Sequence, residues 1–217
     1  GIFGVAMSVA ILVASLWSFG SIDHMIDVTF VRAERHDAQV AFAMPEPARA
    51  AFSARQMPGV LAVEPFRSVS ARISNRNLSR KLSITGRPSQ PDLSRVLSPD
   101  LRPMSMPGAG LLLSEALANA LQVNRGERVT VEFLEGKRHT VTMPVSGLSL
   151  GYVGLGAAMD IEALNLAMGE GPVISGVNFL LDGSGRDAFY ASAKKTPATS
   201  FVTVTALTVA RFKETLA

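Results

Sequence analysis

The sequence predicts an α+β (α/β) fold. A mixed sheet of two strand–helix–strand units has helices on one face, a small β-rich insert lies between the units, and a membrane helix precedes them. Residues 1–22 carry no charged side chain, residues 38–68 and 173–204 share the order strand, helix, strand, and the stretch between them alternates as hairpins do. At 217 residues the chain can hold one medium-sized domain or two small ones.

The first part of the chain has the composition of a membrane-spanning helix. Its uncharged stretch ends at Ile22 and is rich in aliphatic and aromatic side chains, and a span needs about 20 such residues. A secretory signal peptide has a shorter apolar region of roughly 7–15 residues, and a buried core helix is also shorter, so both alternatives fit less well. The chain begins at Gly1 and not at Met, so we expect a piece of a longer protein.

After Gly20 the pattern becomes amphipathic, because charged residues such as Asp23 and Asp27 alternate with apolar ones. We predict that the membrane helix continues into water as a stalk. The apolar residues of this stalk include Ile22, Met25, Ile26 and Phe30, the candidate coupling residues.

The first strand–helix–strand unit follows the stalk. Residues 38–44 read as a strand, and Pro45 opens a helix that runs to about Gln56, since proline is tolerated in a first helical turn. Pro58 and Gly59 end that helix, and residues 60–64 form the next strand.

The second unit repeats this order near the end of the chain. Residues 173–181 read as a strand, a Gly-rich turn leads into a helix that ends near Lys195, and residues 200–204 form the last strand. Both units contain Ala-Phe-x-Ala, at residues 51–54 and 188–191. Two such units predict a two-layer arrangement of sheet and helices.

The insert is predicted to be rich in β-structure. Residues 69–86 alternate as a hairpin, and five prolines make residues 86–110 an irregular connection. A short strand at residues 111–113 then precedes a helix that Ser114 caps and that ends at Leu121. The rest of the insert consists of a hairpin of residues 127–134 and 138–145 and a helix of residues 160–168.

A final helix is predicted to begin at Thr205. With this helix, the predicted organisation has five parts. They are residues 1–37 (membrane and stalk helix), 38–86 (first half of the sheet), 87–171 (inserted subdomain), 172–205 (second half) and 206–217 (a helix leading to a further span).

Motifs for catalysis are weak. Residues 147–151 match G-x-S-x-G, but all three histidines precede Ser149, whereas the hydrolase order places histidine last. Residues 154–156 begin a dinucleotide-type fingerprint that Met159 breaks. The histidines are too scattered for a metal site, and cysteine is absent. We therefore predict no catalytic residue, no metal site and no cofactor.

The charge of the chain is mildly basic, with a formal value of +3. This value is too small to indicate a nucleic-acid partner. Residues 67–102 nevertheless contain many more Arg and Lys than Asp and Glu. Such a bias could face anionic lipid headgroups or an acidic partner, although a solvated surface is the commoner explanation.

Several segments, in their order, resemble the extracytoplasmic core domain of FtsX-like (MacB-type) ABC transporter permeases. The similarity begins with the uncharged helix that continues into residues 21–27. It includes the Met57-Pro58-Gly59-Val60 turn, residues 63–67, residues 84–86, the Leu113-Ser114-Glu115-Ala116-Leu117-Ala118 segment, Gly126-Glu127-Arg128-Val129-Thr130-Val131, and Pro197 before the last strand and helix.

The resemblance implies a porter-like pair of units with a variable insert, followed by further membrane spans. It implies a non-enzymatic domain on the periplasmic side of the inner membrane, with ATP hydrolysed by a cytoplasmic ABC ATPase subunit. The domain would pass on motion or engage cargo for export or extraction, through a stalk whose candidate coupling residues are Ile22, Met25, Ile26 and Phe30.

The implied partners are the ATPase, membrane lipid, a second permease in a dimer and a periplasmic adaptor protein. The alternative is a periplasmic binding or scaffold domain held by a single membrane helix. Further spans after Ala217 would distinguish the two.

Overall fold

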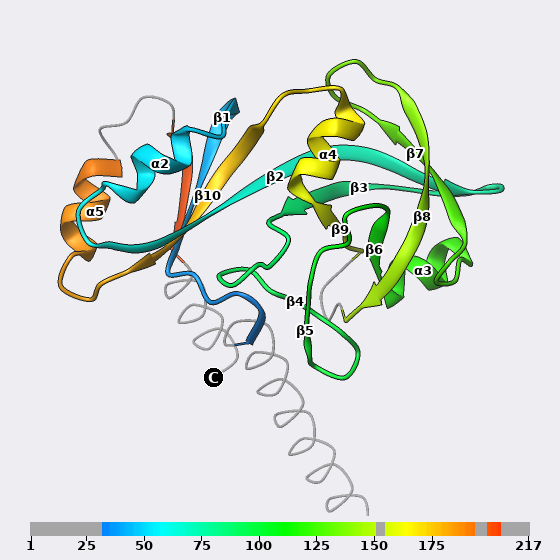
Figure 1. The fold of residues 1–217 in the computed structure, drawn as a ribbon, viewed down its shortest axis with the longest axis horizontal. Coiled ribbons are helices and arrows are strands. Elements are labelled where there is room, and N and C mark those ends of the chain that lie inside the picture. Colours follow the sequence, from blue (N-terminus) through cyan, green and yellow to red (C-terminus); the bar gives the residue numbers. More distant parts are fainter. Residues whose placement is uncertain (1–31, 151–154, 194–198, 205–217) are drawn as a thin grey trace, which may run out of the picture.

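A computed structural model describes residues 32–150, 155–193 and 199–204 of the chain (Figure 1). Nine strands form one sheet in the order β11-β1-β10-β2-β3-β9-β6-β8-β7, with a further pairing between β2 and β7. Strand β2 (Val60–Asn75) runs through both parts of this sheet.

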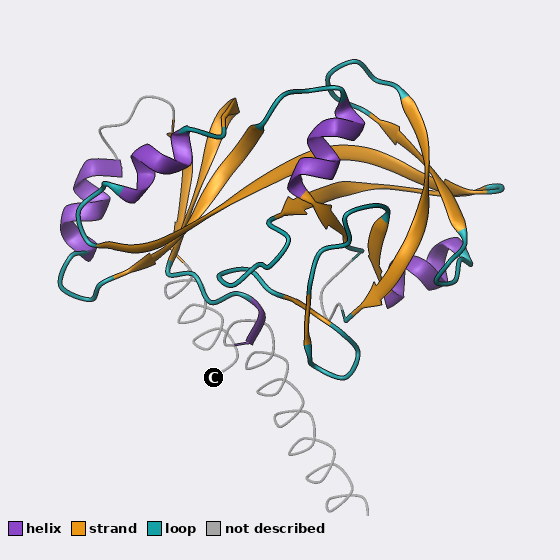
Figure 2. Ribbon diagram, in the orientation of Figure 1, coloured by secondary structure: helices purple, strands orange, loops and turns teal. Residues whose placement is uncertain are grey.

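The first part is a four-stranded antiparallel sheet. It contains β11 (Thr199–Val204), β1 (Ala38–Pro47), β10 (Val173–Leu181) and the first half of β2. Helices α2 (Ala50–Arg55) and α5 (Arg186–Ala193) lie side by side on it (Figure 2). Both helices bury side chains in the cluster that the sheet contributes to, including Ala54, Phe189, Val40, Val63 and Phe179.

The second part is a closed ring of six strands. Strand β2 pairs with β10 up to Phe66 and with β3 (Leu78–Arg87) from Arg67 onward. The ring continues through β9 (Ala157–Asp160), β6 (Leu111–Ser114), β8 (Thr140–Ser149) and β7 (Arg128–Phe133), which pairs back onto β2. The β3–β9 and β6–β8 pairs are parallel, and the other pairs are antiparallel.

Alternate residues of each strand point into the ring, and because these residues are apolar the interior of the ring is apolar. Val69, Ala71 and Ile73 of β2 are completely buried. Helices α3 (Glu115–Leu121) and α4 (Ile161–Met168) add leucine and methionine side chains to the same core. The result is a second core, separate from the one under α2 and α5.

Many predicted elements are confirmed. Both units have the order strand, helix, strand. The strands of the second unit have bounds close to the predicted ones, whereas in the first unit the strand predicted at residues 60–64 is the start of β2, which runs on to Asn75. The predicted hairpin turns at residues 75–77. Ser114 caps α3 by accepting a hydrogen bond from the Leu117 N–H, as predicted, and Asp160 caps α4 in the same way.

Other predictions are corrected by the strand pairing. Strand β1 extends to Pro47 and α2 begins only at Ala50, because that segment pairs with the start of β10 around an irregularity in the register. Residues 86–110, predicted to be an irregular connection, contain two short paired strands, β4 (Val96–Leu97) and β5 (Pro103–Met104). Strand β9 was not predicted. The predicted sheet with helices on one face is found in the first part, whereas the strands of the second part form a ring.

The domain bounds at residues 86 and 171 stay predictions. The pairing of β3 with β2 and β9 favours moving the first bound to Phe66, because the hairpin of residues 69–86 belongs to the ring. Residues 34–37 are extended and not helical. The predicted membrane span and the helix after Thr205 lie outside the described residues. Within those residues no helix is long and apolar enough to cross a membrane.

Candidate functional site

The predicted coupling residues Ile22, Met25, Ile26 and Phe30 lie outside the described residues, so their role stays a prediction. The described chain starts where the predicted stalk would reach the folded domain. The candidate site lies at this junction. It consists of residues 32–37, the loop of residues 91–95 and the two side chains Glu64 and Arg87.

The junction begins with a short antiparallel contact. The Arg35 N–H donates to the Leu93 carbonyl at 2.9 Å, and the Arg95 N–H donates to the Ala33 carbonyl at 2.8 Å. Glu34 and Ser94 are the paired residues between these two bonds. The segment that enters the domain is therefore fixed to the loop by backbone hydrogen bonds, which do not depend on side-chain identity.

Glu64 of β2 holds the other side of that loop. One carboxylate oxygen accepts from the Asp92 and Leu93 N–H groups at 2.6 and 2.9 Å. The other oxygen accepts from the Ser94 N–H at 3.0 Å and from the Ser94 hydroxyl at 2.7 Å. The Glu64 side chain is buried, and a buried carboxylate is tolerated only where donors and opposite charge surround it.

Arg87, the last residue of β3, supplies the opposite charge. Its guanidinium donates to the Ser94 carbonyl. Burial lowers the pKa of Arg87 from its ordinary value, while the negative charges of Glu34 and Glu64 raise it. The loop is thus held from two strands, through Glu64 on β2 and Arg87 on β3.

Ion pairs on the solvent-exposed side of the junction join Asp92 to two arginines. Asp92 contacts the Arg35 guanidinium at 2.7 Å and also pairs with Arg95. The hydrogen bond from Arg95 is the main cause that lowers the pKa of Asp92 below its ordinary value. The Asp92 side chain is 66% exposed, so we assign these pairs little weight in stability.

Asp37 makes a second attachment immediately before β1. Its carboxylate accepts from the Leu181 N–H at 2.9 Å and pairs with Arg186 of α5 at 2.8 Å. Its own N–H donates to the Phe179 carbonyl at 2.9 Å. Residues 34–37 are therefore tied both to the loop of the second part and to the end of β10 in the first.

The edge strand of the first part, β11, ends beside the start of its neighbour, β1. Ala38, the first residue of β1, pairs with Val204, the last residue of β11, in an antiparallel register. The chain segments that flank the domain consequently meet it at the same end of two neighbouring strands.

Ser149, His36 and His139 lie apart from one another along the chain, and each has a structural environment of its own. Ser149 is buried at the end of β8. His36 contacts the Leu93 carbonyl at 3.3 Å, and His139 contacts the Ala167 carbonyl at 2.6 Å. In the part of the chain that the structure describes, no group of three His, Cys, Asp or Glu residues could hold a metal ion.

The solved structures that share this fold include domains of two transporters. The periplasmic region of MacB from Actinobacillus actinomycetemcomitans matches with a TM-score of 0.54 at 14% identity, over 86% of this chain and 95% of that one. The chain has the fold of a MacB periplasmic domain. The extracellular domain of the noncanonic ABC-type transporter YknZ from Gram-positive bacteria matches with a TM-score of 0.53 at 13% identity, over 77% of this chain and 98% of that one. No family model and no curated protein matches the sequence.

The MacB-type resemblance of the sequence is therefore confirmed in the fold. The junction itself was not predicted. Glu64 stands in an otherwise apolar strand segment, Val60–Phe66, and an acidic residue at a buried position is the signal that could have pointed to it. The loop that it binds is separated from it by 28 to 30 positions in the sequence, and nothing in local spacing links the two.

Proposed function

We propose that this chain is the extracytoplasmic domain, with its preceding membrane helix, of an ABC transporter permease in the inner membrane. The MacB-like fold supports this general kind of protein. The paired positions of Ala38 and Val204 suit a domain inserted between two membrane helices, because both flanking segments meet it at one end. The domain itself would carry no catalytic step, and ATP would be hydrolysed by a cytoplasmic ABC ATPase subunit.

The proposed task of the domain is to transmit ATP-driven motion to its outer surface, or to engage cargo for export or extraction. The observation that carries this proposal is the junction at Glu64, because that side chain joins β2 to the loop whose backbone holds the entering segment. Strand β2 has 16 residues, extends for about 50 Å and belongs to both parts of the sheet. A movement of residues 32–37 would consequently act on the whole domain as a rigid body.

The proposed partners follow from the same assignment. They are the cytoplasmic ATPase, a second permease in a dimer, membrane lipid around the helix and a periplasmic adaptor protein. A periplasmic binding or scaffold domain on a single membrane helix is the alternative. It predicts the same fold and no movement on ATP binding.

A helix-breaking insertion tests mechanical coupling. We would insert Gly-Pro beside Ile26 in the parent protein and measure hydrogen exchange at residues 32–37 and 91–95 with and without ATP. The proposal predicts that ATP changes the exchange in the unmodified complex, and that the insertion abolishes this change and transport while ATP binding persists. An ATP response that survives the insertion would count against coupling through the stalk.

A further inference from the structure

One part of the outward face of the six-stranded ring, on β3, β2, β7 and β8, is rich in cations and hydroxyl groups. Residues that face one another across paired strands share a face of the sheet. One such row crosses β3, β2, β7 and β8 and consists of Lys81, Arg72, Glu132 and Thr140. The neighbouring row consists of Ser79, Ser74, Thr130 and Thr142.

We call these two rows, together with Arg76 at the hairpin turn and Arg128 at the start of β7, the outer wall. The alternate residues of the same strands, such as Val69, Ala71 and Ile73, are completely buried in the ring. The outer wall is therefore the solvent side of a well-packed sheet, and its side chains are free of any role in the core.

The charge of the outer wall is one-sided. Glu132 is its only carboxylate, and the ion pair with Arg72 already neutralises it. Arg76, Lys81 and Arg128 are exposed and have no carboxylate partner among the described residues. One Arg128 nitrogen donates to the Thr142 carbonyl at 2.9 Å, which holds that guanidinium against β8.

Apart from Glu132, every polar side chain of the outer wall can donate hydrogen bonds, because Arg and Lys only donate and Ser and Thr can donate as well as accept. Alternate residues of a strand are about 7 Å apart and neighbouring strands about 5 Å apart, so the donors form a regular grid. A partner rich in negative acceptors and poor in donors complements this grid. Phosphate and carboxylate groups have this chemistry.

The outer wall offers no anchor for a folded protein partner. The large apolar side chains that the described structure exposes are Met44, Phe52, Leu61, Leu155 and Leu166, and none of them belongs to the wall. Protein interfaces usually depend on such aromatic and aliphatic anchors.

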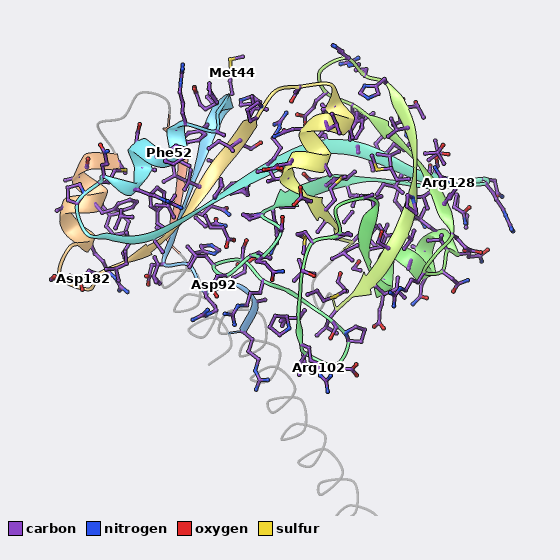
Figure 3. All side chains as sticks on the ribbon, in the orientation of Figure 1. Met44, Phe52, Asp92, Arg102, Arg128 and Asp182 are labelled. Atoms are coloured by element: carbon purple, nitrogen blue, oxygen red, sulfur yellow. The ribbon has the colours of Figure 1, made fainter. Side chains whose placement is uncertain are left out.

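A bilayer is disfavoured by position. Arg128 lies at one end of the long axis of the molecule, whereas Asp92, where residues 32–37 join the domain, lies near the middle of that axis (Figure 3). This step rests on the proposed function, which places the membrane beyond residue 32, whereas the charge argument stands without it.

We propose that the outer wall binds an anionic polymer of the linear polyphosphate type, whose oxyanion groups repeat along the chain. Several oxyanions of one polymer chain could contact Arg76, Lys81 and Arg128 at once, so weak individual contacts would add up by avidity. Such binding weakens steeply with salt, because each neutralised contact releases counterions.

Fluorescently labelled linear polyphosphate is the probe, and its anisotropy is measured with the full chain in a neutral detergent. The test variant is Lys81→Thr/Arg128→Thr, since threonine suits an exposed strand position. The control variant, Arg49→Ser/Arg102→Ser, removes the same charge from exposed positions away from the wall. We expect saturable binding at 50 mM salt that the test variant weakens about 10-fold and the control less than 2-fold, with a salt dependence shallower by about two contacts in the test variant.

Three results would overturn the proposal. They are absence of polyphosphate binding, equal weakening by both variants, and better competition by polyglutamate or by anionic lipid vesicles than by unlabelled polyphosphate at matched charge. The last result would assign the wall to an acidic protein or to a membrane. Copurification of an ATPase tests the transporter assignment separately, so either proposal can fail without the other.

Discussion

Replacing Glu64 with glutamine should release the loop of residues 91–95 from strand β2 while preserving side-chain volume. The two carboxylate oxygens accept four hydrogen bonds in the native domain. Glutamine replaces one of these oxygens with an NH2 group. Turned toward Ser94, whose hydroxyl can accept from it, this group leaves the Ser94 N–H without an acceptor, and turned the other way it leaves the Asp92 and Leu93 N–H groups without one. The substitution also removes the negative charge beside the buried guanidinium of Arg87.

The magnitude follows from these contacts. A hydrogen bond to a charged group contributes about 1.5–3 kcal/mol, so the loss of one, together with the weakening of the bonds that remain to a neutral amide, gives about 3 kcal/mol before the loop relaxes. Leu93 and Ser94 are buried, which limits their access to water, whereas Asp92 is exposed and can rehydrate. We therefore expect about 3 kcal/mol, a large share of the roughly 5–15 kcal/mol that stabilises a typical domain.

Hydrogen exchange and urea unfolding measure the effect together. At about 3 kcal/mol, the Leu93 and Ser94 amides should exchange on the order of 100-fold faster, since 1.4 kcal/mol corresponds to a factor of about ten. Glu132→Gln is the matched control, because its carboxylate pairs with Arg72 on the surface and should cost less than about 1 kcal/mol. Unchanged protection of residues 91–95 in Glu64→Gln, or equal unfolding midpoints for the two variants, would refute the reasoning.

Three further substitutions test the packing around the two parts of the sheet. Arg67→Met breaks a pair in which a buried guanidinium contacts Glu170 at 3.0 Å, and it should cost about 3–5 kcal/mol in urea unfolding; a loss below about 1 kcal/mol would show that the pair is dispensable. Gly176→Ala places a Cβ 2.3 Å from a backbone oxygen of the neighbouring strand, so its melting temperature should drop by several degrees, whereas Gly171→Ala, with nothing within 4 Å, should melt like the native protein. Asp160→Ala removes the acceptor for two N–H groups at the start of α4 and should cost about 1 kcal/mol in urea unfolding, with Asp160→Asn recovering most of it; equal midpoints for the alanine and asparagine variants would argue against capping.

Local sequence signals specified the elements well. Ser114 before an apolar helical stretch and Asn75-Arg76-Asn77 between alternating strands are start and turn signals that act over a few residues. The structure confirms both. Such signals work because capping and turn formation depend on neighbouring backbone groups and not on the rest of the fold.

The arrangement of the strands could not be predicted in the same way. Strand β2 changes partner between Phe66 and Arg67, where two consecutive side chains are buried and the alternation is interrupted. The sequence of β2 alone does not say which strands pair on either side of that point. The β9 segment, Ala157–Asp160, is short and Gly-rich residues precede it, so it has almost no strand pattern of its own. Its place is set by pairing with β3 and β6, which are distant in sequence.

The candidate site was equally inaccessible from spacing. Glu64, Arg87 and the loop of residues 91–95 come together because β2, β3 and the entering segment converge there. The sequence did indicate the basic bias of residues 67–102. In the structure some of these cations are committed, such as Arg67 to Glu170 and Arg72 to Glu132, and others remain on the outer wall.

Copurification tests the central claim most directly. The intact parent protein would be extracted from membranes in a mild detergent and its partners identified by mass spectrometry. The account predicts that an ATP-binding-cassette subunit copurifies in a fixed ratio with the chain. A protein that is isolated alone, as a species with a single membrane span, would contradict the permease assignment and favour an anchored binding or scaffold domain.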